Sequence, residues 1–194
     1  MRNPRTLHIE LHGSEPAIWR RIEVDGSMTL DRFHEILQGA LGWTNLHLHL
    51  YMDKIPFIRG NVEAGGRPVT WLMANSIEEG LAGEGDAGIT LINALARSGG
   101  TLRYECDLGD CWMHVVTEES SRPLDPEAPE SRVTDGALHV PLEDSGGLHG
   151  WYEMPKLARA TSADPDRSYL LDWFRAHAGY FTPHGPPGLR RGRG

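Results

Sequence analysis

Closely spaced histidines are the residues in this sequence with the clearest capacity for chemistry. His47 and His49 stand two apart in an alternating segment, and side chains two apart on a strand project from the same face. Imidazole nitrogens that share a face can meet a metal ion at about 2.1 Å. Together with His114 from a later segment, they form a candidate metal site. Zinc and manganese are the divalent metals that suit such a mixed site.

Further side chains could complete a pocket around these three. His34 borders the apolar stripe of a predicted helix, and nearby carboxylates could act as additional ligands. The alternative is structural, because a histidine at the edge of a core often bonds a backbone carbonyl and does nothing else, and aspartates often cap tight turns. The full candidate pocket comprises His34, Trp43, His47, His49, Asp107, Asp110, Trp112, His114, Glu143 and Asp144.

Nucleophilic catalysis finds little support in the sequence. The chain has no Gly-x-Ser-x-Gly elbow, and Cys111 and His114 stand three apart, so on a strand they face opposite sides. Cys106 and Cys111 are separated by four residues, which is not zinc-finger spacing, and we predict that both are free thiols. The catalytic residues therefore stay unassigned. We expect no cofactor apart from zinc or manganese in the metal-site alternative.

The charge balance bears on possible partners. The 194 residues carry 19 Lys+Arg and 27 Asp+Glu, a net charge of −8. This argues against a protein whose whole surface is basic and binds phosphates. The tryptophans are better explained as core residues than as stacking platforms for bases. The arginines that could contact a nucleic acid are Arg20, Arg21, Arg190, Arg191 and Arg193.

Periodicity indicates an α+β fold that positions these side chains. Alternation predicts an antiparallel hairpin over 7–11 and 17–24, followed by a helix that Thr29 caps and Gly42 ends. A strand over 47–52 and a short edge strand over 55–58 would complete a β-grasp-like ββαββ start to an antiparallel or mixed sheet. Later come a brief helix, a β-hairpin over 101–106 and 111–117, and C-terminal helices.

The predicted organisation is a single domain over 1–183. It contains an acidic, proline-rich loop at 118–144 and a helical extension at 150–178, and a basic, disordered tail follows at 184–194. The sequence has no apolar run long enough to cross a membrane. The N-terminus lacks the apolar segment of a signal peptide, so we expect a cytoplasmic protein.

Five stretches, in the same order, resemble the plasmid pRiA4b ORF-3-like family, which is also labelled as a TnpR-like passenger protein of IS1096-type insertion elements. They are 18–22 (IWRRI), 30–43 (LDRFHEILQGALGW), 47–49 (HLH), 104–114 (YECDLGDCWMH) and 141–147 (PLEDSGG). The resemblance implies a link with mobile elements and brings no defined activity.

This chain departs from the family pattern at three positions. Ser145 stands where the family commonly has cysteine, and Val140 stands near the other common cysteine. Any metal or bridge that depends on that cysteine pair is therefore excluded here. Leu108 replaces the usual phenylalanine, a mild change in side-chain volume.

These observations rank three functions. The first is a non-catalytic binding or adaptor module of a mobile-element-associated family, with a protein or nucleic-acid partner. The second is a metal-dependent hydrolase that uses a His/carboxylate site. The third is a DNA-binding accessory protein of a transposable element. The sequence indicates neither the ligand nor the oligomeric state.

Overall fold

The computed structural model describes residues 3–54, 68–121, 129–159, 168–169 and 172. The chain divides into two compact units, Met1–Leu148 and His149–Gly194. The first unit holds the sheet and the ten residues of the predicted pocket. A basic, disordered tail and a second C-terminal helix are predicted from the sequence, and most of their residues lie outside the described ranges.

The first unit is an α+β fold, as the sequence pattern predicts. Its described elements are β1 (Pro4–Leu11), β2 (Trp19–Asp25), α1 (Leu30–Leu41), β3 (His49–Met52), β4 (Thr70–Leu72), α2 (Ala74–Glu78), β5 (Glu84–Gly85), the 3₁₀ turn η1 (Asp86–Gly88), α3 (Leu91–Arg97), β6 (Thr101–Cys106), β7 (Trp112–Ser121) and β8 (Ser131–Ala137). Helix α4 (Gly147–Arg159) begins at the end of this unit. The order β1-β2-α1-β3-β4 is consistent with the predicted ββαββ start, although β4 is not the strand expected over 55–58.

The described strands form one mixed sheet, in the order β5-β4-β3-β6-β7-β1-β2-β8. All neighbouring pairs are antiparallel except β4 and β5, which are parallel. The predicted β6–β7 hairpin pairs Cys106 with Trp112 at its closed end. The predicted edge strand over 55–58 lies outside the described residues.

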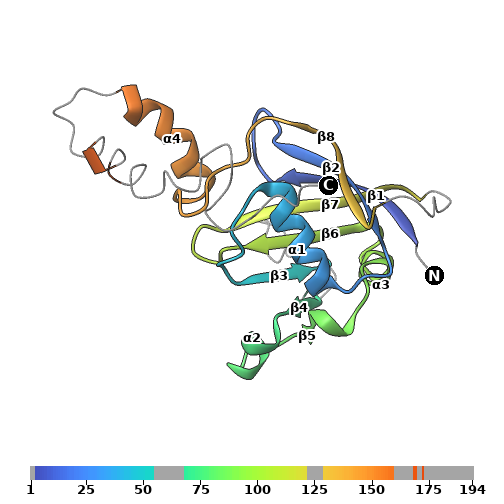
Figure 1. The fold of residues 1–194 in the computed structure, drawn as a ribbon. Coiled ribbons are helices and arrows are strands. Elements are labelled where there is room, and N and C mark those ends of the chain that lie inside the picture. Colours follow the sequence, from blue (N-terminus) through green and yellow to red (C-terminus); the bar gives the residue numbers. More distant parts are fainter. Residues whose placement is uncertain (1–2, 55–67, 122–128, 160–167, 170–171, 173–194) are drawn as a thin grey trace, which may run out of the picture. The chain divides into compact units, whose positions relative to one another are not determined.

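Helix α1 lies across one face of the sheet (Figure 1). Its apolar positions recur every three or four residues, and Leu30, Phe33 and Leu37 are fully buried. Gly42 ends the helix in the left-handed conformation, with φ at 75°, which a residue without a side chain adopts at little cost. Alternate side chains of β1, β6 and β7 supply the opposing layer of the core: Leu7, Ile9, Leu11, Leu102, Tyr104, Cys106, Trp112, His114 and Val116.

The structure differs from the sequence interpretation between residues 118 and 144. Strand β7 continues to Ser121, and β8 pairs with β2 inside the stretch expected to be an acidic loop. Most β8 side chains are exposed, so the strand carries no apolar alternation for a sequence pattern to detect. Its backbone ladder is joined by cross-strand ion pairs instead, including Arg132 with Glu23 and Asp135 with Arg21.

Within the described ranges, no helix is both long and apolar enough to cross a membrane. Both cysteines are free thiols, with Cys106 buried in the sheet and Cys111 exposed at the hairpin turn.

Candidate functional site

Three irregular segments meet at one end of the central strands. They are the approach to β3 (43–48), the β6–β7 turn (107–111) and the loop that follows β8 (141–147), and together we call them the three-segment surface. Hydrogen bonds join all three: Trp43 Nε1–H to the Pro141 carbonyl (2.9 Å), Thr44 N–H to Glu143 Oε2 (2.8 Å), Asp107 N–H to the Leu48 carbonyl (3.0 Å) and Gly146 N–H to Asp110 Oδ2 (2.9 Å).

Left-handed backbone conformations concentrate in these segments. Asn45, Asp107 and Asp144 have φ values of 60°, 60° and 57°, a region that asparagine and aspartate tolerate better than other residues with side chains. Gly147 has φ 68°, and a Cβ there would lie 2.6 Å from the Asp110 carbonyl oxygen. Only glycine allows the loop to approach the β6–β7 turn this closely.

His47 lies between two carboxylates on this surface. Its Nδ1 is 3.6 Å from Asp107 Oδ2, and its Nε2 is 3.6 Å from Asp144 Oδ1. One donor atom from each of the three residues lies within 4.8 Å of the other two. Among the described residues this is the one group of three or more side chains spaced to hold a metal ion. All three are accessible to solvent to some degree, Asp144 most of all.

Beneath this surface, His34 belongs to a closed circuit of buried hydrogen bonds. Gln38 Nε2–H donates to the Tyr104 hydroxyl (2.9 Å), which in turn donates to His34 Nδ1 (2.8 Å). His34 Nε2–H donates to Asn45 Oδ1, and the Asn45 backbone N–H returns to Gln38 Oε1 (3.0 Å). This chain of donors and acceptors requires a neutral imidazole. Burial, reinforced by the neighbouring His49, lowers the pKa of His34 to about 4.

His49 is also buried, and it has a carboxylate partner of its own. Its Nε2–H donates to Asp86 Oδ2 at 3.1 Å, and both side chains are almost fully removed from solvent. Its ring stacks on His34 with centroids 3.6 Å apart and planes inclined by only 9°. Nitrogen lone pairs lie in the ring plane, so two imidazoles stacked face to face cannot direct them at one shared metal ion.

His114 is 1% exposed and lies in the core, where its ring is 6.0 Å from that of Tyr104, centroid to centroid. Its Nδ1–H donates to the Trp112 carbonyl at 3.2 Å, and its ring meets Trp43 edge to face with centroids 5.4 Å apart. Burial lowers the pKa of His114 to about 4, so this imidazole is neutral at pH 7. Trp43 and Trp112 are themselves buried, with ring centroids 6.1 Å apart.

The predicted metal trio of His47, His49 and His114 is therefore not a cluster in the structure. The physical reason lies in the backbone before β3. The strand begins at His49, while His47 lies in a bend, so the alternation that would place both rings on one face does not extend to His47. His49 points into the core and His47 toward the β6–β7 turn.

The remaining predicted pocket residues lie on or near the three-segment surface. Asp107 Oδ1 accepts the backbone N–H groups of Gly109 and Asp110, which is the turn-capping role that sequence reasoning offered as the alternative. Glu143 Oε2 also accepts the Thr44 hydroxyl at 2.7 Å. Sequence reasoning missed Gln38, Asn45, Tyr104 and Asp86. The spacing of His34 and Gln38, four apart on one helix face, was the one signal available for Gln38.

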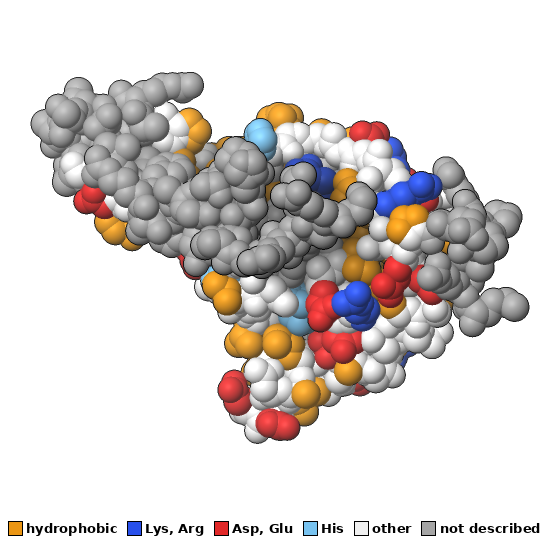
Figure 2. Space-filling model, in the orientation of Figure 1, with side chains coloured by type: hydrophobic (Ala, Val, Ile, Leu, Met, Phe, Trp, Pro, Cys, Tyr) orange, Lys and Arg blue, Asp and Glu red, His pale blue; other side chains and the backbone are white. Residues whose placement is uncertain are grey.

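The predicted nucleic-acid residues that the structure describes already have protein partners. Arg21 makes a two-pronged contact with Glu119, at 2.7 and 2.9 Å, and also pairs with Asp135. Arg20 donates to the backbone carbonyls of Trp19 and Ala137. On the face that Figure 2 shows, the basic side chains of the described residues are scattered and do not form a continuous basic patch.

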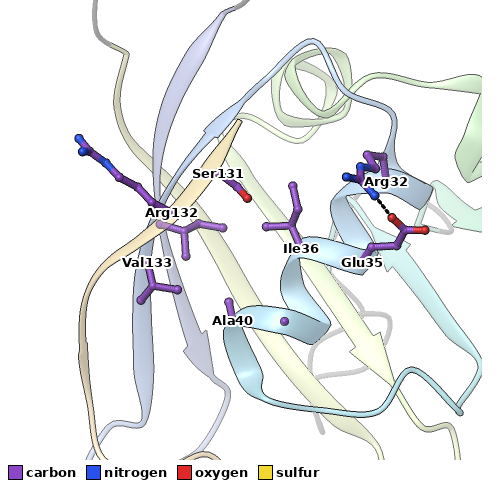
Figure 3. A pocket seen from close by; sticks show the side chains of 9 residues that line it. Arg32, Glu35, Ile36, Ala40, Ser131, Arg132 and Val133 are labelled. Atoms are coloured by element: carbon purple, nitrogen blue, oxygen red, sulfur yellow. Dashed lines mark hydrogen bonds and ion pairs between the residues drawn. The ribbon is translucent and has the colours of Figure 1, made fainter. Parts of the chain in front are cut away.

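A separate groove of about 370 Å³ lies between α1 and β8. Figure 3 shows Ile36 and Ala40 of α1 facing Val133 of β8, with Arg32 and Glu35 joined to each other near the start of the helix. Ile22 of β2 also lines the groove. A Cβ added at Gly39 would meet nothing within 4 Å, so the α1 wall is open at that point.

The fold is that of a small α+β protein with one mixed sheet. The chain belongs to the plasmid pRiA4b ORF-3-like protein family, whose model matches residues 4–185. It is 32% identical to the "Uncharacterized protein y4hQ" of Sinorhizobium fredii over 171 residues, which cover 86% of this chain and 78% of that protein. The crystal structure of MM3350 from Methanosarcina mazei, titled a protein of unknown function, has the same fold. It matches with a TM-score of 0.71 and 22% identity over 90% of each chain.

Proposed function

We propose that this protein is a non-catalytic binding module whose recognition surface is the groove between α1 and β8. The observation that carries the proposal is the closed circuit through His34, which occupies both of its nitrogens with protein partners. A general acid or base needs a nitrogen free to exchange protons with a substrate, and a pKa near the working pH. The buried imidazoles of His34 and His114 fail on both access and pKa.

The thiols support the same conclusion. Burial raises the pKa of Cys106, and partial burial with nearby carboxylates raises the pKa of Cys111. The reactive form of a cysteine is the thiolate, so neither is activated as a nucleophile. The buried histidines and both cysteines are therefore poorly suited to acid–base or nucleophilic chemistry, and this favours a binding role.

The proposed occupant of the groove is an extended segment of a protein partner that carries aliphatic side chains. Val133 is 52% exposed, and together with Ile36 and Ala40 it offers an apolar lining. Strand β8 is the last strand of the described sheet on this side, and an outer strand can hydrogen-bond an added strand. The charged residues at the rim, Arg32 and Arg132, are already paired with glutamates.

The same pairing weighs against the DNA-binding alternative, because Arg20 and Arg21 are occupied as well. The link with mobile elements and a cytoplasmic location rest on the sequence and are part of this proposal. The partner would then be another protein of such an element.

Peptide selection tests the groove directly. A library of extended peptides with alternating aliphatic and polar residues would be panned against the full chain, and the affinities of enriched peptides measured by fluorescence anisotropy. Val133→Asp places a charge in the groove, and we expect at least about tenfold weaker binding. Leu138→Asp is the matched control, since Leu138 is equally exposed (54%) and lies just beyond β8.

Enrichment of peptides that bind wild type and the Leu138→Asp variant alike, but not Val133→Asp, supports the proposal. Failure to enrich any peptide over an unrelated protein would overturn it. Equal binding to the Val133→Asp variant would place the recognition surface elsewhere and overturn it too.

A further inference from the structure

We propose that His47, Asp107 and Asp144 together bind one divalent transition-metal ion, with zinc preferred over manganese. This site is distinct from the groove between α1 and β8, and the inference does not depend on the function proposed for that groove. It also differs from the histidine trio that the sequence pattern indicated, since it combines one imidazole with two carboxylates.

The donor types and spacings fit such an ion. Zinc binds imidazole nitrogen and carboxylate oxygen at about 2.0–2.2 Å, which places tetrahedral donors about 3.4 Å apart. His47 Nδ1 lies 3.6 Å from Asp107 Oδ2, and His47 Nε2 lies 3.6 Å from Asp144 Oδ1. Only one of these nitrogens can bind the ion, and a set with one donor atom from each of the three residues lies within 4.8 Å. The Asp144 side chain is 56% exposed, so it is free to close the remaining difference by rotation.

The carboxylate of Asp107 is already oriented for this task. Its Oδ1 accepts two backbone N–H groups from the β6–β7 turn, at 3.0 and 3.2 Å, and this leaves Oδ2 facing His47. Hydrogen bonds of this kind fix the position of metal ligands in proteins. Asp107 and Asp144 both have left-handed backbones, and they approach His47 from two different segments.

Negative charge at this surface exceeds the positive charge available to balance it. The ion pairs of Asp107 and Asp144 that the structure describes are both with His47, a residue that can carry at most one positive charge. Asp110 lies in the same turn and Glu143 in the same loop as these ligands. A divalent cation would neutralise this excess.

An independent observation in the loop that carries Asp144 also points to a missing partner. Ser145 is 6% exposed, and its hydroxyl oxygen has no hydrogen-bond partner among the described residues. Glu143 Oε1 is likewise buried without a partner there. Unpaired buried oxygens are costly, and these two belong to the residues on either side of Asp144, the ligand that this loop supplies.

The consequence of binding is a crosslink between three segments that are distant in sequence. Each segment contributes one ligand, so the ion holds the approach to β3, the β6–β7 turn and the loop after β8 together. Three protein ligands also leave at least one coordination position for water or an anionic group. We therefore expect zinc to raise the melting temperature as well as to bind.

Calorimetric titration with zinc chloride tests the site. The full chain is purified with a tag that contains no histidines, stripped with a chelator and titrated alongside His47→Gln, Asp107→Asn and Asp144→Asn. We expect one zinc per wild-type chain, and affinity at least about tenfold lower in each variant. His139→Gln is the matched control, because His139 is exposed and lies outside the cluster.

Cobalt substitution supplies a second readout. The visible absorption bands of bound Co²⁺ report a low-symmetry site with nitrogen and oxygen donors, and we expect them to vanish in the His47→Gln variant. Asp144→Asn keeps the test valid if another variant fails to fold, since that side chain is largely exposed. Absence of stoichiometric zinc binding to wild type overturns the proposal, as does wild-type affinity in the three variants or an equal loss in His139→Gln.

Discussion

The imidazole rings of His34 and His49 lie face to face, with centroids 3.6 Å apart and planes 9° from parallel. One ring comes from α1 and the other from β3, so the stack fastens the helix to the sheet. Two imidazolium ions could not share this geometry inside the core without strong repulsion. The contact therefore holds while His34 is neutral, and this makes the stability of the fold depend on pH.

Acid should destabilise the protein well before its carboxylates are all protonated. In the folded state the pKa values of His34 and His114 are lowered from 6.5 to about 4, so the unfolded chain binds protons first. Stability is full above about pH 6.5 and falls as the pH drops toward 4. For His114 the loss amounts to about 3 kcal/mol over that window. Urea unfolding at several pH values measures it, and a His114→Gln variant should show a flatter profile.

Tyr104→Phe should lower the free energy of unfolding by about 1–3 kcal/mol. The change deletes one hydroxyl, which leaves His34 Nδ1 without its donor and leaves the Gln38 amide N–H with only the Cys106 sulfur, at 3.4 Å, as an acceptor in a buried site. Tyr169→Phe is the control, because Tyr169 is 74% exposed and should tolerate the change. Chemical denaturation gives both values. Equal stability of the two variants would mean that the circuit contributes nothing to folding.

The two core tryptophans should respond differently to phenylalanine. Trp43 Nε1–H donates to the Pro141 carbonyl, whereas Trp112 Nε1–H has no partner among the described residues. Trp43→Phe therefore leaves the Pro141 carbonyl without its donor and also reduces the side-chain volume. We expect it to lower the stability of the fold more than Trp112→Phe does. Trp112→Ala opens a large cavity and should cost about 3–5 kcal/mol. Thermal unfolding gives the melting temperatures of Trp43→Phe, Trp112→Phe and Trp112→Ala. A lower melting temperature for Trp112→Phe than for Trp43→Phe would contradict this prediction.

Gly147→Ala should be more damaging than Gly42→Ala, although both glycines have left-handed backbones. At Gly42 a Cβ meets nothing within 4 Å, so the cost is the backbone strain of about 1–2 kcal/mol. At Gly147 the new atom also clashes with the Asp110 carbonyl oxygen at 2.6 Å, so the loop must move away from the β6–β7 turn. The denaturation midpoints of the Gly147→Ala and Gly42→Ala variants test this. Similar midpoints would show that the loop after β8 moves away from the β6–β7 turn at little cost.

Sequence reasoning predicted the elements that carry strong periodicity. The apolar stripe of α1 and its stop at Gly42 fixed that helix to within a residue, and the β6–β7 hairpin was found in the same way. It missed β8 because exposed side chains on an outer strand leave no alternation to detect. A periodic pattern reports only relationships between residues that are close in sequence, and this limited the prediction of secondary structure.

The candidate site shows the same limit more sharply. The sequence interpretation places residues of the β6–β7 turn and of the loop after β8 in one candidate pocket, and in the structure Asp107 and Asp144 both lie near His47. Their grouping was not predictable, since one bend before β3 decides whether His47 joins the core or the surface. Asp86 could not be paired with His49 from sequence either, because 37 residues separate them and no motif connects them.

The hydrogen-bond circuit of His34, Gln38, Asn45 and Tyr104 also bears on how precisely α1 is set. A helix held by an apolar stripe alone can roll about its axis or slide by part of a turn, since aliphatic contacts reform after small shifts. Hydrogen bonds tolerate no such slip, and His34 and Gln38 meet one tyrosine hydroxyl from two successive turns. The buried polar side chains thus fix both the rotation of α1 about its axis and its position along that axis. They give the helix one rotational setting, and with it one position for every residue that α1 presents to solvent.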